Sequence, residues 1–125
     1  MKIIHTTKAA APLGHYSQAV VHNGLVYASG QLPIDPANPE SATTDPAEQT
    51  RITLQNLQKV LIAAGSDLDH VLKTTVYIAD ISLWPTVNEA YAKIFGEHRP
   101  ARSAVPTKNL PKGFLVEIEA IAAIC

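Results

Sequence analysis

The sequence predicts an α+β fold in which two helices cover one face of a single mixed β-sheet. Runs rich in β-branched residues alternate with two segments whose apolar residues recur every three or four positions. In chain order the expected elements are β-ββ-α-β-α-β-β, and helices set among hairpin strands are typical of an α+β sandwich. A length of 125 residues without repeats or linkers predicts one domain, residues 1–125.

The N-terminal third is expected to form three strands. Residues 2–6 are a short first strand, and two β-rich runs, 18–22 and 25–31, flank Asn23-Gly24. An Asn-Gly pair accepts the positive φ angles of a type I′ turn, so these two runs should form a hairpin. Three prolines in residues 32–44 predict an irregular loop after it.

A helix is expected to begin at Asp45-Pro46. Asp45 suits the N-cap, Pro46 suits the first turn, and Glu48 occupies the reciprocal position of a capping box. Apolar residues then recur at spacings of three and four, which forms one buried stripe, and Gly65 is a suitable stop. The stripe consists of Leu54, Leu57, Leu61 and Ala64.

The C-terminal half predicts a strand, a second helix and two more strands. Residues 71–79 are rich in β-branched residues and should form a strand. A helix follows from about Ser82 to Gly96, and Pro85 is tolerable only in its first turn. Residues 101–105 and 114–123 are the closing strands. The buried face of the second helix is expected to comprise Val87, Ala90, Tyr91, Ile94 and Phe95.

The last strand carries charge in an otherwise apolar segment. Alternation puts one purely apolar set, Val116, Ile118, Ala120 and Ala122, beneath the helices. The other set, Leu115, Glu117, Glu119 and Ile121, then lies on a face that no element of this chain covers. That face is either a solvated sheet surface or a partly polar subunit interface, where a carboxylate could orient a water molecule.

Arg102 also has two interpretations. An arginine on a strand often forms a surface ion pair, but its neighbours Ala101, Ser103 and Ala104 are small and leave room around the guanidinium. A planar fork of N–H donors in such a space suits a bidentate grip on a carboxylate, worth about 1.5–3 kcal/mol. We expect this guanidinium on the uncovered face, where it would bind an organic acid.

Composition narrows the function classes. A net charge of −1 disfavours a nucleic-acid surface, no apolar run is long enough to span a membrane, and no signal-peptide pattern is present, so a cytoplasmic location is expected. An apolar content of 46% suggests an oligomer. Cys125 is the single cysteine and is expected to be inert at a frayed end, and the five histidines show no metal-ligand spacing. We therefore predict no metal site.

Six segments in order resemble the RidA family, also known as YjgF/YER057c/UK114. They are GHYSQAV, VYASGQLPIDP, NLQKVLIAAGSDLDHVLKTTVYIADI, VNEAYAKIF, RPARSAV and LPKGFLVEIEAIA. The resemblance implies a chorismate-mutase-like protomer, a homotrimer whose sheets form an inner barrel, and clefts between subunits. It also implies hydrolysis of 2-imino and enamine acids, such as 2-iminobutanoate and 2-iminopropanoate, to 2-oxo acids and ammonia, with no metal or other cofactor.

The resemblance implies a role for each residue of this sequence that matches a site position in the family's motifs. Arg102 would hold the substrate carboxylate and Glu117 would orient the attacking water, with Glu119 a weaker candidate. The remaining lining residues would be Tyr16 (from a neighbouring subunit), Ser29, Gly30 and Asn88. Two departures affect the cleft: Ala104 stands where many members have cysteine, and Pro106 removes an amide donor nearby.

Two other functions stay open. The same arginine would serve a non-catalytic trimer that binds 2-oxo acids or related metabolites. RNA cleavage or translation inhibition, also attached to this family, is disfavoured because the lysines are dispersed and no aromatic-basic stacking surface is visible.

Overall fold

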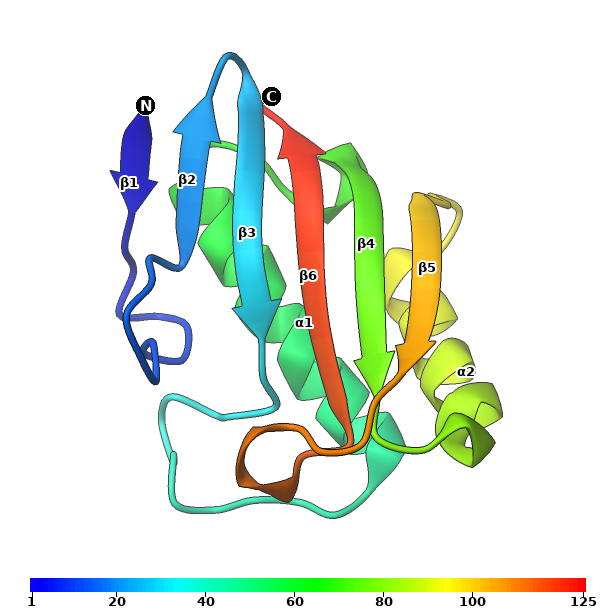
Figure 1. Ribbon diagram of the computed structural model, residues 1–125. Coiled ribbons are helices and arrows are strands. Elements are labelled where there is room, and N and C mark those ends of the chain that lie inside the picture. Colours follow the sequence, from blue (N-terminus) through cyan, green and yellow to red (C-terminus); the bar gives the residue numbers. More distant parts are fainter.

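The computed structural model describes residues 1–125 and contains a six-stranded sheet with two helices on one side (Figure 1). The strands are β1 (Lys2–Ile4), β2 (Ala19–His22), β3 (Leu25–Gln31), β4 (Val71–Ile78), β5 (Ala101–Pro106) and β6 (Val116–Ala123). The helices are α1 (Pro46–Ala63) and α2 (Trp84–Phe95).

The sheet order is β1-β2-β3-β6-β4-β5. All neighbouring strands are antiparallel except β4 and β5, which are parallel and are connected through α2. The predicted mixed sheet and α+β class are therefore confirmed. The hairpin is confirmed as well, because Asn23 and Gly24 adopt φ values of 50° and 77° between β2 and β3.

Helix α1 begins and ends where its sequence signals predict. The Asp45 side chain accepts a hydrogen bond from the Ala47 amide, and Gly65 has a φ of 87° beyond the last turn. The predicted reciprocal role of Glu48 is wrong. Its carboxylate pairs with the Arg51 guanidinium on the next turn, while the Asp45 amide donates to the Thr43 hydroxyl. A charge-assisted pair with a nearby arginine is the stronger interaction for this glutamate.

Helix α2 starts later than the sequence indicates. A short 3₁₀ turn, Ile81–Leu83, occupies the expected first residues, and the α-helix begins at Trp84 with Pro85 in its first turn. Val87, Tyr91 and Phe95 are buried as predicted, whereas Ala90 and Ile94 are only half-buried.

The core lies between the sheet and the two helices. Leu54, Leu57 and Leu61 of α1 are fully buried, and β6 alternates buried and half-buried residues as its sequence predicts. The opposite face of the sheet has no helix or loop over it (Figure 1). Burying the apolar half of β6 beneath α1 therefore leaves Glu117 and Glu119 on the uncovered face.

Asn56 anchors two loops to α1. It is buried, and its amide nitrogen donates to the carbonyls of Leu32 (2.9 Å) and Ile34 (2.8 Å) while its oxygen accepts from the Ala10 amide (3.3 Å). Ala10, Leu32 and Ile34 form a second small apolar cluster with Phe114. This buried polar side chain holds the loops that flank the candidate site described below.

The C-terminal residues are held in place, contrary to the expectation of a frayed end. The Cys125 amide donates to the Gly65 carbonyl at 3.0 Å, and the Ser66 hydroxyl donates to the Ala123 carbonyl at 2.6 Å. Neither helix is both long and apolar enough to cross a bilayer. The cytoplasmic location and the single-domain assignment stay predictions from the sequence.

Candidate active site

A β-bulge at Ser29-Gly30 positions the first part of the site. The pairing of β3 with β6 runs from Ala28 opposite Ala120 to Gln31 opposite Ile118, so β3 has one extra residue in this interval. A bulge of this kind redirects side chains and is common beside active sites. The Ser29 side chain is fixed here because its hydroxyl donates to the Ser17 carbonyl at 2.6 Å.

Glu117 lies directly against Gly30. A Cβ atom at position 30 would overlap Oε2 of Glu117 and would lie 2.9 Å from its Cδ, so glycine is needed for this close approach. Burial, together with the negative charge of Glu119, raises the pKa of the Glu117 carboxyl above its ordinary value. Such a shift moves a carboxylate toward the range in which it accepts and returns protons near neutral pH.

Glu119 is held by a different partner. The Tyr77 hydroxyl on β4 donates a hydrogen bond to the Glu119 carboxylate. This hydrogen bond, with burial and the adjacent negative charges, raises the pKa of the Tyr77 phenol. The Glu119 carboxylate is therefore occupied by Tyr77. The Glu117 carboxylate has no side-chain hydrogen-bond partner and borders a cavity.

That cavity has a volume of about 460 Å³ and opens on the uncovered face. Tyr16, Ser29, Gly30 and Glu117 line it together with apolar residues that include Leu32. The exposed Tyr16 ring is oriented by a 3.0 Å hydrogen bond that its hydroxyl accepts from the Leu13 amide. Four of the six predicted site residues thus meet in one chain. Tyr16 shares this cavity with Glu117 of its own chain, and its expected contribution to the cleft of a neighbouring subunit stays a prediction.

Arg102 and Asn88 lie elsewhere and form a second group. The guanidinium Nη1 donates to the Asn88 side-chain oxygen at 2.8 Å. Its Cζ atom is 4.6 Å from the centroid of the Trp84 ring and 4.9 Å from that of Tyr91. Two aromatic faces and one amide therefore fix an exposed cation at the N-terminal half of α2.

The expectation that Arg102 lies on the uncovered face is wrong. In the parallel pairing of β4 with β5, Arg102 is opposite Thr74, which is fully buried on the helix side. Residues paired on neighbouring strands point to the same face of the sheet, so Arg102 points toward α2. A cavity of about 460 Å³ beside the guanidinium is lined by residues that include Asn88, Tyr91, His98 and Arg99.

Arg102 has no acidic partner. No carboxylate lies within ion-pair distance of its guanidinium, so the surface-ion-pair interpretation is wrong. Asn88 occupies one of the five N–H donors, and the stacking rings leave the donor edge accessible. An unpaired, preorganised guanidinium of this kind is suited to a planar anion such as a carboxylate.

Two aromatic residues of this second group were not among the predicted site residues. Tyr91 was expected only on the buried face of the second helix and is indeed buried, but its ring and that of Trp84 also stack on Arg102. Their helical spacing with Asn88, at positions 84, 88 and 91, is a signal that could have placed all three beside the strand that follows.

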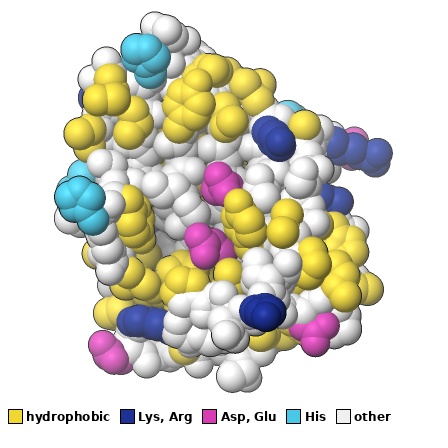
Figure 2. All heavy atoms as spheres, in the orientation of Figure 1, with side chains coloured by type: hydrophobic (Ala, Val, Ile, Leu, Met, Phe, Trp, Pro, Cys, Tyr) yellow, Lys and Arg dark blue, Asp and Glu magenta, His cyan; other side chains and the backbone are white.

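The uncovered face also carries apolar side chains. Tyr27 is 45% exposed and Val105 is 37% exposed, and the half-buried Ile121 lies opposite Tyr27 in the sheet. Figure 2 shows hydrophobic side chains gathered on this face around acidic ones, with the surface hollowed beside them. Exposed apolar side chains gathered on one face are a feature of protein interaction surfaces.

This fold and site belong to a recognisable class. A family described as Endoribonuclease L-PSP matches residues 6–124. A RutC family protein of Pyrococcus horikoshii is 46% identical over 97% of this chain and 96% of its own length. A 2-iminobutanoate/2-iminopropanoate deaminase of Bos taurus is 47% identical over 97% of this chain and 88% of its own.

Solved structures agree with these relatives. A putative endoribonuclease from Thermotoga maritima superposes with a TM-score of 0.93 at 42% identity, covering 98% of this chain and 97% of its own. Escherichia coli TdcF, determined with bound serine, superposes with a TM-score of 0.94 at 38% identity over the full length of both chains. The chain therefore belongs to the Endoribonuclease L-PSP family, which is the RidA group that its motifs resemble.

Proposed function

We propose that this protein is a deaminase that hydrolyses reactive 2-imino acids, and their enamine tautomers, to 2-oxo acids and ammonia. The observation that carries the proposal is Arg102: an exposed guanidinium without an acidic partner, held by Asn88 and two aromatic rings. Such a group binds a small carboxylate in one orientation. The deaminase name of a relative 47% identical over 97% of this chain gives the substrate class.

The active protein is proposed to be a homotrimer whose sheets face inward as a barrel. Two features support this assembly. The uncovered sheet face is partly apolar, and the candidate residues form two separate groups within one chain. In the trimer, Tyr16, Ser29, Gly30 and Glu117 of one subunit would face Asn88 and Arg102 of the next. Each cleft would then contain one acid-binding group and one water-binding group.

The proposed reaction needs little beyond this pairing, because a protonated imine is already a strong electrophile. Arg102 holds the substrate carboxylate and so orients C2. Glu117 accepts a proton from water as the water oxygen bonds to C2, then returns it to the nitrogen. The C–N bond breaks as Glu117 takes the proton of the new C2 hydroxyl and passes it to the departing ammonia, so the iminium acid plus water becomes a 2-oxo acid plus ammonium. Burial of Glu117 raises its pKa, which makes its carboxylate a stronger base toward the attacking water.

A coupled assay tests the activity. A threonine dehydratase generates 2-iminobutanoate, and the rate of 2-oxobutanoate formation is compared with and without this protein, in an amine buffer that traps residual imine. We expect acceleration by the wild type, and loss of it in both Arg102→Ala and Glu117→Gln. Arg102→Lys, which keeps the charge but not the fork, should recover only part of it.

The alternative that the same arginine supports is a trimer that binds 2-oxo acids without catalysis. Isothermal titration with 2-oxobutanoate separates the two functions. Binding that depends on Arg102, without any acceleration by the wild type, would exclude the deaminase. Cleavage of RNA has weaker support, since the net charge is −1 and the cations are dispersed.

Mixed trimers test the shared cleft. Arg102→Ala keeps an intact Glu117 group, and Glu117→Gln keeps an intact Arg102 group. If the cleft lies between subunits, co-expressing these two inactive variants should regenerate some complete clefts and measurable activity. Co-expression that restores nothing, or a native mass equal to one chain, would contradict the assembly.

A further inference from the structure

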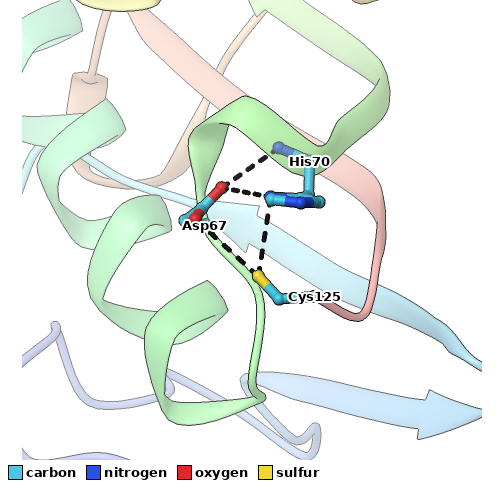
Figure 3. A group of neighbouring side chains, drawn as sticks. All are labelled: Asp67, His70 and Cys125. Atoms are coloured by element: carbon cyan, nitrogen blue, oxygen red, sulfur yellow. Dashed lines mark hydrogen bonds and ion pairs between the residues drawn. The ribbon is translucent and has the colours of Figure 1, made fainter.

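A cluster of three potential metal ligands lies outside the candidate active site. It consists of Asp67 and His70, on the turn after α1, and Cys125, which follows β6. Figure 3 shows the three side chains pointing toward one another. The imidazole Nδ1 of His70 is 2.7 Å from Oδ1 of Asp67 and 3.5 Å from Sγ of Cys125, and this sulfur is 3.7 Å from Oδ2 of Asp67.

Backbone contacts hold this cluster together. Asp67 caps the 3₁₀ turn Leu68–His70 by accepting the His70 amide at 3.1 Å, which directs the carboxylate toward the imidazole. The hydrogen bonds from Cys125 to Gly65 and from Ser66 to Ala123 attach the other segment to the same turn. The three side chains are therefore brought together by the fold.

The geometry does not suit a catalytic triad. In a Cys-His-Asp triad the imidazole contacts the acid with one nitrogen and the nucleophile with the other, so that a proton can be relayed. Here the carboxylate and the thiol approach the same Nδ1 atom. Partial desolvation and the adjacent Asp67 charge also raise the pKa of the Cys125 thiol, which is the opposite of activation.

We propose that Asp67, His70 and Cys125 form a binding site for a divalent transition-metal ion, with zinc the preferred ion. Bond lengths of about 2.3 Å for Zn–S and about 2.0–2.1 Å for Zn–N or Zn–O give tetrahedral edges of about 3.6 Å between sulfur and the lighter ligands, and about 3.3 Å between nitrogen and oxygen. The two distances to sulfur, 3.5 and 3.7 Å, match these edges. The 2.7 Å contact joins Nδ1 of His70 to Oδ1, the other carboxylate oxygen, so this contact must be given up when Nδ1 and Oδ2 bind one ion.

The binding step has a defined proton balance. The thiol loses its proton to solvent, and Nδ1 of His70 binds the ion with its lone pair while Nε2 carries the single proton of the neutral ring. Solvent supplies the fourth ligand, because the side chains of His70 and Asp67 are 43% and 35% exposed. Affinity should accordingly rise with pH. The mixed nitrogen, sulfur and oxygen set favours zinc over magnesium or calcium.

Cobalt(II) provides the direct test, since its spectrum reports a bound thiolate. Reduced, tag-free protein is titrated with Co²⁺ and then with Zn²⁺. We expect a thiolate-to-cobalt charge-transfer band and strong visible bands of a tetrahedral ion, both displaced by stoichiometric Zn²⁺. Cys125→Ser should remove the charge-transfer band, and His70→Gln should weaken Zn²⁺ binding at least about tenfold. His5→Gln, which removes another exposed histidine, is the matched control and should bind like the wild type.

A second measurement needs no variant. Zn²⁺ should slow alkylation of the Cys125 thiol by iodoacetamide, and a chelator should restore the rate. Cobalt spectra without a charge-transfer band, or alkylation that Zn²⁺ does not change, would overturn the proposal. The same would follow if the cluster variants and His5→Gln bound Zn²⁺ equally. None of these results depends on deaminase activity, so the two proposals fail independently.

Discussion

Replacing Gly30 with alanine should displace the Glu117 carboxylate and lower kcat without lowering the stability of the fold. The added methyl would overlap Oε2 of Glu117 and would lie 2.9 Å from its Cδ and 3.1 Å from its Cγ. Ordinary contacts require about 3.4 Å or more, so the carboxylate must move, and its free end by about 1.5 Å. A displacement of that size at a reacting group costs about 100-fold in rate.

The fold should tolerate this substitution. Gly30 does not have a positive φ, so alanine is compatible with its backbone. Reduced entropy of the unfolded chain then offsets part of the clash, by about 0.4–1 kcal/mol. We therefore expect a melting temperature close to that of the wild type and a kcat about 100-fold lower in the 2-iminobutanoate assay.

Gly14→Ala is the matched control. A methyl at position 14 meets the Tyr16 ring at 3.9 Å, which is an ordinary contact, so its effect on kcat should be much smaller. A Gly30→Ala protein that retains wild-type kcat would refute the reasoning, because Glu117 would then not need its present position. An equally slow Gly14→Ala protein would refute it too, since the effect would not be specific to the carboxylate.

Three further predictions concern single side chains. Trp84→Leu removes one ring from Arg102 and should raise the Kd of 2-oxobutanoate about two- to fivefold, from a loss of about 0.5–1 kcal/mol; an unchanged titration would contradict the stacking role. Folding raises the pKa of Glu117, so ionisation of this carboxyl costs stability as pH rises through the folded pKa. Glu117→Gln should therefore melt above the wild type at about pH 8 and lose that advantage near pH 4, and thermal scans showing the reverse trend would contradict the sign of the shift. Asp45→Ala removes the cap of α1 and should lower the free energy of unfolding by about 1 kcal/mol in urea, without changing deaminase activity.

The sequence was sufficient for most of the fold because its local signals agree with one another. Asn23-Gly24 at the hairpin, Asp45 and Gly65 at the ends of α1, and alternation along β6 each act over a few residues. A prediction was wrong where one side chain had two possible partners. Glu48 has both a backbone amide and Arg51 within reach, and only the folded helix decides between them.

The arrangement of the site was less predictable. Alternation along β5 gives two faces but does not say which one packs on α2. The side of Arg102 therefore depends on its parallel pairing with β4, a contact set by the whole sheet. The Asp67–His70–Cys125 cluster was invisible for a similar reason, because 55 residues separate His70 from Cys125 and only β6 returns the chain to that turn.

The extra residue at Ser29-Gly30 has a consequence for how this family can vary. Ala28 and Gln31 are both buried although an odd number of steps separates them, which an uninterrupted strand could not achieve. Loss of Ser29 or Gly30 would leave two steps between Ala28 and Gln31, so both would stay on the helix-covered side in a regular strand, but the bulge itself would be lost. The length of β3 at this point is therefore part of the site: a single deletion would remove the bulge beside the cavity while leaving the buried side chains of Ala28 and Gln31 in register.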